Sequence, residues 1–248
     1  MIVLRNSDEI DAIRRAGRIV ALVLEKIKFA TKPGVETMTL DRIARDEILK
    51  NKGLPAFKGY KGYPANICAS INEVVVHGIP SDRRLESGDI ISIDVGVKFR
   101  DYYADGAVTI AVGEITDRAR ELLKVTEDAL YAGIDKARKA NRLSDISSAV
   151  QGYVEANDFS VVRMFVGHGI GTKIHEEPEI PNFGSPGKGP ALEPGMVLAI
   201  EPMVNAGTHE VEILEDGWTA VTKDRKLSAH FEHTIAVTDD GALILTKL

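Results

Sequence analysis

The chain has 248 residues, of which 44% are hydrophobic and 27% charged, a balance typical of a globular protein rather than a disordered or fibrous one. Its net charge of −6 argues against a protein whose main task is to bind nucleic acid. Cys68 is the only cysteine, so no internal disulfide forms, and no stretch approaches the ~20 apolar residues of a membrane helix. We expect a soluble, cytoplasmic protein.

Four stretches carry apolar residues at the three- and four-residue spacing of an amphipathic helix. The first follows a capping box in which Glu9 stands three residues after Asn6, and threonines cap the next two. The predicted helices start at Asn6, Thr39, Thr116 and about Ser144, and the last apolar residues of their stripes are Ile27, Ile48, Leu130 and Val154.

Short runs rich in β-branched residues lie between and after these helices and predict strands. The predicted strands cover residues 89–95, 107–112, 196–200, 210–214 and 234–237. This order of helices and strands predicts an α+β fold whose helices pack on one face of a mainly antiparallel sheet.

The chain contains an internal repeat that centres on acidic residues. Residues 88–97 resemble residues 195–204, and the same position holds Asp94 in one copy and Glu201 in the other. A second acid follows in each half, Asp105 before Thr-Ile-Ala-Val at 109–112 and Glu232 before the same four residues at 234–237. We therefore expect one domain over 1–248, built from related halves at about 1–114 and 115–248.

These four acids lie in apolar strand segments with few lysines or arginines beside them. A buried carboxylate without compensation costs several kcal/mol, so it is protonated, paired or bound to a metal. For any single acid, a place at a solvent-facing strand end is the ordinary alternative. Four acids at repeat-related positions instead favour a metal site.

A glycine-rich segment at 167–171 surrounds His168, and His175 follows seven residues later. The glycine spacing does not fit a dinucleotide fingerprint, and Glu179 takes the place of the second histidine of a zinc-protease HExxH motif. Four carboxylates balance the charge of two divalent cations. One imidazole among oxygen ligands favours manganese, iron or cobalt, and zinc is allowed. The predicted chemistry is hydrolysis by a metal-activated water, and the predicted ligands are Asp94, Asp105, His168, Glu201 and Glu232.

With these residues, the chain resembles type I methionine aminopeptidases over essentially its whole length. The most specific matches are Asn72-Glu-Val-Val-Val-His77-Gly-Ile-Pro, the pair Asp94 and Asp105, the segment from Gly167 to Pro178, Ile-Glu201-Pro-Met, and Glu232-His-Thr. The resemblance implies the α+β pita-bread fold with two pseudo-symmetric halves.

The resemblance also implies a role for each site residue. Asp94 would chelate one metal, His168 and Glu201 the other, and Asp105 and Glu232 would bridge the two. Glu201 would act as general base and proton shuttle. His175 would stabilise charge on the substrate carbonyl oxygen, and His77 would contact the adjoining peptide nitrogen.

The resemblance further implies a methionine-binding pocket, because thioethers pack well against aromatic rings. Ile174 departs from the family, whose members often have phenylalanine there. The pocket residues would be Phe57, Tyr60, Tyr63, Cys68, Ile174 and Trp218. A monovalent cation would be held at Asn72, Val74 and Ser228, whereas His209, His230 and His233 receive no role beyond surface or supporting positions.

The implied activity is co-translational removal of the N-terminal methionine, with small second residues preferred. The implied partners are N-terminal methionine peptides, nascent chains and, transiently, the ribosome; we expect a monomer without specific nucleic-acid recognition or membrane association. The short spacings between His168, Glu201 and Glu232, and a start without a Cys/His-rich extension, favour the minimal bacterial form.

Three alternatives stay open. The first is a proline-specific aminopeptidase or dipeptidase of the same fold, although those usually carry an additional N-terminal domain. The second is a binding module that kept the fold and lost the metals. The third is an unrelated α+β protein whose acids sit at strand ends. The presence of all five ligand residues favours the methionine aminopeptidase.

Overall fold

The computed structural model describes residues 1–248. It contains four α-helices: α1 (Ser7–Ala30), α2 (Thr37–Lys50), α3 (Asp117–Lys136) and α4 (Leu143–Glu155). The strands of the first half and one short helix are β1 (Leu54–Pro55), η1 (Tyr60–Gly62), β2 (Cys68–Ile71), β3 (Val74–Val76), β4 (Ile90–Phe99) and β5 (Tyr102–Ala111). The strands of the second half are β6 (Ser160–Val161), β7 (Gly167–Gly169), β8 (Glu176–Ile180), β9 (Val197–Ile200), β10 (Met203–Asn205), β11 (Val211–Ile213), β12 (Ala220–Thr222), β13 (Ser228–His230), β14 (Glu232–Thr238) and β15 (Gly241–Ile244).

Helix starts follow local capping chemistry in two cases and tertiary contacts in a third. The Asn6 side chain accepts the Glu9 N–H, and the Glu9 carboxylate accepts the Asn6 N–H, which confirms the capping box of α1. Thr116 caps α3 as predicted. The prediction for α2 is wrong by three residues, because Glu36 and not Thr39 is the capping residue and the helix begins at Thr37, whose hydroxyl and Ser81 exchange hydrogen bonds.

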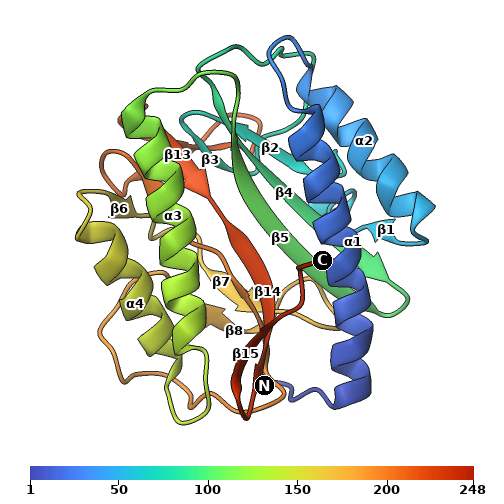
Figure 1. The fold of residues 1–248 in the computed structure, drawn as a ribbon, viewed down its shortest axis with the longest axis vertical. Helices are drawn as coiled ribbons and strands as arrows, with labels where there is room; N and C mark the ends of the chain where they lie inside the picture. The colour runs from blue at the N-terminus through green and yellow to red at the C-terminus, as the bar shows by residue number, and fades with distance from the viewer.

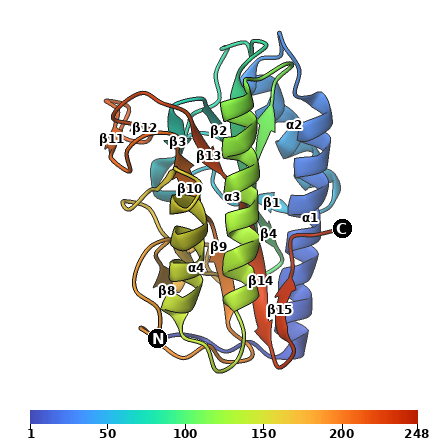
Figure 2. The same ribbon diagram turned by 60° about the vertical axis from the view of Figure 1, so that its left-hand side comes forward.

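One nine-stranded antiparallel sheet runs through both halves in the order β1-β4-β5-β14-β9-β7-β8, with β2 added to β4 and β15 to β14. Strand β14 joins the halves, since it pairs with β5 on one side and with β9 on the other. Helices α1 and α3 lie side by side across the same face of this sheet (Figures 1 and 2). The predicted α+β class is therefore confirmed.

The apolar core consists of several clusters, and the largest of them combines residues of both halves. The largest lies between α1, α2 and the β4–β5 hairpin, and the second half has its own clusters beneath α3 and α4. None of the four helices combines the length and the hydrophobicity that a membrane-spanning segment needs. The sheet face opposite the helices carries the site described next.

Segment 167–169, which the sequence favours as a loop, is instead strand β7, between β9 and β8. Its two glycines make this possible, because a Cβ on Gly167 would lie 2.4 Å from the Ala199 carbonyl oxygen. A Cβ on Gly169 would lie 2.1 Å from the Glu177 carbonyl oxygen. Only glycine lets the backbone pack this closely, and the result is that His168 is fixed in the middle of the sheet.

Candidate metal centre

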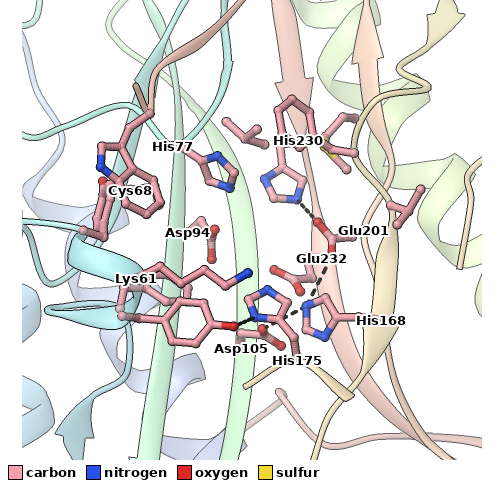
Figure 3. Close-up of a pocket in the computed structure, with 18 of the residues that line it drawn as sticks. Lys61, Cys68, His77, Asp94, Asp105, His168, His175, Glu201, His230 and Glu232 are labelled. Atoms are coloured by element: carbon pink, nitrogen blue, oxygen red, sulfur yellow. Dashed lines mark hydrogen bonds and ion pairs between the residues drawn. The ribbon is translucent and has the colours of Figure 1, made fainter. Parts of the chain in front are cut away.

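The five predicted ligands meet in one cavity of about 300 Å³ (Figure 3). Each comes from a different place in the central sheet. Asp94 lies on β4, Asp105 on β5, His168 on β7, Glu201 directly after β9, and Glu232 at the start of β14. Because β14 joins the halves, residues far apart in the sequence converge on one point.

His168 lies at the centre of this cluster. Its Nε2 atom is 3.5 Å from Asp105 Oδ2 and 3.4 Å from Glu201 Oε1. Its Nδ1 atom is 2.9 Å from the Gly169 carbonyl oxygen, so Nδ1 carries the proton and donates it there. The Nε2 lone pair therefore faces carboxylate oxygens, an arrangement that fits a cation between them.

The carboxylates are buried and lack basic partners. Burial, reinforced by the Asp105 carboxylate, raises the pKa of Glu201 to about 8 even though His168 lies beside it. Burial likewise raises the pKa of Asp94 to about 8, and the pKa values of Asp105 and Glu232 also lie above their ordinary range for the same cause. Their ion pairs within 4 Å are with histidines and include no lysine or arginine.

Two buried oxygens, Asp94 Oδ1 and Glu232 Oε1, have no hydrogen-bond partner. One ligand atom each from Asp105, His168 and Glu232 lies within 4.8 Å of the others. Oxygen and imidazole donors with unmet lone pairs and raised pKa values fit a divalent cation, which would supply the missing positive charge.

The wall of the cavity beside the cluster is aromatic. Tyr63 and Trp218 meet edge to face with ring centroids 5.1 Å apart, and the Trp218 ring also meets His77 at 6.3 Å. Tyr60 stacks on His175 at 5.2 Å, and its hydroxyl lies 3.0 Å from His175 Nδ1. The rings of Tyr60, Tyr63 and Trp218 line the cavity together and form what we call the aromatic slot.

Most of the predicted pocket residues line this cavity, namely Phe57, Tyr60, Tyr63, Cys68, His77, His175 and Trp218. Ile174 does not line the cavity, so the prediction is wrong for this residue. Its side chain is buried in the large apolar core with residues of α1 and α2 and is not part of the cavity lining.

His230 lines the cavity although the sequence assigns it no role. It is 2% exposed, and its Nε2 atom lies 3.6 Å from Glu201 Oε2 without a hydrogen-bond partner. The missed signal is the strand period of two, which puts His230 on the same face as Glu232. His233 is one residue out of that phase, and its Nδ1 contacts the Thr246 hydroxyl on the opposite side. The other lining residues absent from the prediction are Lys61, Val76, Met164, Phe165, Val166 and Met203.

Two residues of the implied monovalent cation site lie together near β3. The Ser228 N–H donates to the Asn72 carbonyl oxygen at 2.8 Å, and Val74 is the first residue of β3. The Asn72 side chain accepts the Ile90 N–H and donates to Asp89, which anchors this turn to the start of β4.

An antiparallel sheet that buries four carboxylates and an imidazole in one cavity defines a metal-dependent enzyme. The sequence matches metallopeptidase family M24 over residues 11–239. A methionine aminopeptidase of Clostridium perfringens is 53% identical over 248 residues, with 100% of both chains covered. The chain belongs to metallopeptidase family M24 and, within it, to the methionine aminopeptidases.

Solved structures agree. A methionine aminopeptidase from Thermotoga maritima superposes with a TM-score of 0.99 at 44% identity, covering 100% of both chains, which confirms the pita-bread fold. A prolidase from Pyrococcus furiosus shares the fold alone, with a TM-score of 0.80 at 22% identity, and this chain covers 66% of its length.

Proposed function

We propose that this enzyme removes the N-terminal methionine from peptides and nascent chains in the cytoplasm, acting as a monomer in transient contact with the ribosome. The observation that carries the proposal is the aromatic slot formed by Tyr60, Tyr63 and Trp218 directly beside the carboxylate cluster. One domain over 1–248, with halves 1–114 and 115–248, would supply the whole site.

Two divalent cations would be held by this chain, chosen among manganese, iron, cobalt and zinc. Asp94 would hold one, His168 and Glu201 the other, and Asp105 and Glu232 both. Bound there, the cations supply Lewis acidity and lower the pKa of a coordinated water to near 7. The resemblance adds a monovalent cation at Asn72, Val74 and Ser228.

Glu201 would serve as general base. Its Oε1 lies 3.4 Å from His168 Nε2 and its Oε2 lies 3.6 Å from His230 Nε2, so the two imidazoles hold the carboxylate in the cavity. A carboxylate in this place would take a proton from water and pass it to the leaving amine.

The two flanking histidines would act as neutral hydrogen-bond donors. Burial lowers the pKa of His77 to about 4, and burial together with His168 lowers the pKa of His175 to about 3, so both are neutral at pH 7. If the Tyr60 hydroxyl donates to His175 Nδ1, the His175 Nε2–H is left to donate to the substrate carbonyl oxygen. His77 would contact the peptide nitrogen beside it.

The register of the sheet supports restriction to N-termini. Cys68 of the pocket wall lies opposite Asp94 in the β2–β4 ladder, so a side chain in the slot brings its own α-amine toward Asp94. The resemblance adds a preference for small second residues.

The test is hydrolysis of Met-Ala-Ser, Met-Leu-Ser, Leu-Ala-Ser and Ala-Pro-Ser by enzyme stripped with a chelator and reloaded with manganese, cobalt, iron or zinc. We expect metal-dependent release of methionine, faster from Met-Ala-Ser than from Met-Leu-Ser. Cleavage only before proline would favour a proline-specific peptidase. No hydrolysis of any of the four peptides with any of the metals would favour a binding module.

A further inference from the structure

Two threonine hydroxyls stand at the two ends of the contact between β5 and β14. The backbone ladder between these strands covers only two residue pairs, Glu232 with Ala107 and His233 with Gly106. Continuing that register by one step in one direction brings Thr234 opposite Asp105. Continuing it two steps beyond Glu232 in the other direction brings His230 opposite Thr109, just past the other end of the ladder.

At both ends a threonine hydroxyl makes the hydrogen bonds that a backbone N–H and carbonyl would make within a ladder. The Thr234 hydroxyl donates to the Asp105 carbonyl oxygen at 2.8 Å and accepts the Asp105 N–H at 3.1 Å. The Thr109 hydroxyl does the same for His230, at 2.8 Å to its carbonyl oxygen and 2.9 Å from its N–H. The two sites are related by the pseudo-symmetry of the halves, but only the first holds a carboxylate of the metal centre.

The backbone of Thr234 is held by the C-terminal segment instead of by β5. Its N–H donates to the Thr246 hydroxyl at 3.2 Å, and its carbonyl oxygen accepts the Leu245 N–H at 2.9 Å. Thr246 and Leu245 are buried, and α1 presses on them closely, since a Cβ on Gly17 would lie 2.3 Å from the Leu245 carbonyl oxygen. With the backbone of β14 occupied in this way, only the side chain of Thr234 can reach Asp105.

The same hydroxyl also touches the carboxylate. Thr234 Oγ1 lies 3.1 Å from Asp105 Oδ1, while Asp105 Oδ2 lies 3.5 Å from His168 Nε2. Thr234 is fully buried and Asp105 is 3% exposed, so no solvent can take over these contacts. The single hydroxyl proton is shared between the carbonyl oxygen and Oδ1, so Thr234 contacts both the backbone and the carboxylate of Asp105.

We propose that Thr234 is a positioning residue that sets Asp105 for metal binding, with the C-terminal segment 245–246 holding Thr234 in place from behind. This rests on the metal centre of the proposed function. Loss of the hydroxyl leaves the Asp105 N–H, carbonyl and Oδ1 without that partner and lets the carboxylate rotate away from the other ligands.

The test compares Thr234→Val and Thr234→Ser with Thr109→Val, which removes the equivalent bonds from His230. Each chelator-stripped protein is titrated with Mn²⁺ by calorimetry, and its Tm is measured. We expect Thr234→Val to raise the Mn²⁺ Kd by about 10- to 100-fold, with Thr234→Ser within about twofold of wild type. Thr109→Val should lose clearly less affinity than Thr234→Val, because His230 reaches the cluster only through Glu201. Both valine variants should lower the Tm, because each loses buried hydrogen bonds.

A Thr234→Val enzyme with the wild-type Kd would overturn the proposal, and so would an equal loss of affinity in Thr109→Val, which would indicate strand spacing rather than Asp105. If Thr234→Val does not fold, Thr234→Cys replaces it, because a thiol of similar size to serine is a weak donor; a wild-type Kd in that variant would overturn the proposal too. Wild-type protein that binds no Mn²⁺ would overturn the metal centre itself.

Discussion

Glu201 is directed by two imidazoles, with Oε1 3.4 Å from His168 Nε2 and Oε2 3.6 Å from His230 Nε2. Glu201→Gln keeps the size of the side chain and one ligating oxygen but cannot accept a proton. We expect kcat on Met-Ala-Ser to fall by about 100- to 10,000-fold. The Tm should not fall, because the change removes a buried acid. Near-normal turnover would remove Glu201 from the role of base.

His175 is predicted to act on the substrate and not on the metals. Its Nδ1 is engaged by the Tyr60 hydroxyl, and its ring lies 4.3 Å from that of His168. We expect His175→Ala to lower kcat by about 100- to 1,000-fold while metal content, measured by elemental analysis, is retained. Tyr60→Phe serves as the matched control, since it removes only the hydroxyl that orients the imidazole, and its loss of kcat should be smaller. A His175→Ala protein that has lost its metal would mean that this histidine is a ligand.

At the scale of elements, the segment that joins β7 to β8 and carries His175 is fastened to the N-terminus of the chain. Arg5 Nη2 lies 2.8 and 2.6 Å from the two carboxylate oxygens of Glu176. Glu176 also accepts the N–H groups of Thr172 at 2.7 Å and Lys173 at 3.0 Å. The Arg5 guanidinium lies against Gly171, where a Cβ would approach it to 2.4 Å. The Glu176 carboxylate therefore holds the turn at residues 172–173 and also joins this turn to Arg5 near the N-terminus.

This carboxylate predicts a specific acid response. Burial alone would raise the pKa of Glu176, but the Lys173 N–H, Arg5 and Thr172 outweigh it and hold the pKa below 4.5. Its bonds therefore stabilise the fold fully above about pH 4.5, and this stabilisation is lost as the pH falls through the lower folded-state pKa. We expect Glu176→Gln to reduce the free energy of unfolding in urea by about 2 kcal/mol at pH 7 and by progressively less below pH 4.5.

The control for this prediction is Glu36→Gln, which breaks the exposed pair with Arg84. Its effect at pH 7 should be below about 0.5 kcal/mol. A difference between wild type and Glu176→Gln that stays constant through the acid range would show that the carboxylate is not the stabilising group.

The helices and strands differ in how well their own local sequence predicts them. Long amphipathic stripes and capping residues sufficed for α1 and α3, because their signals are local. Strand β7 escaped prediction, since its glycines carry no strand preference and are selected by contacts with β8 and β9. The start of α2 is likewise set by Ser81, far along the chain. When an element is determined by contacts with residues distant in the sequence, a local sequence pattern cannot predict it.

At the scale of the whole molecule, the ligand residues could be predicted from the sequence because acidic residues within apolar strands are unusual. The ligand types and the repeat predicted which residues would converge, and the structure brings all five to one cavity. Ile174 and His230 were misjudged for the opposite reason, since an isoleucine and a histidine are ordinary in either a core or a site. Only the direction of each side chain distinguishes these places.

The convergence of both halves on one site makes a final prediction about stability. Asp94 and Asp105 come from the first half, and His168, Glu201 and Glu232 from the second, so bound cations link the halves. A ligand at 100 times its Kd stabilises the folded state by about 2.7 kcal/mol. For a chain of this size, each kcal/mol shifts the Tm by about 2–4 °C, so saturating Mn²⁺ should raise the Tm of stripped protein by about 5–11 °C.

Glu232→Gln is the decisive variant, because it replaces a ligand whose Oε1 has no hydrogen-bond partner. Removing this buried charge should leave the metal-free protein at least as stable as wild type, since an unpaired buried carboxylate is costly. Its Tm should then respond little to Mn²⁺. Glu177→Gln, an exposed acid two residues from His175, should keep the full wild-type shift. An undiminished shift in Glu232→Gln would mean that the stabilising cation binds elsewhere on the surface, and that the buried acids of the sheet serve another purpose.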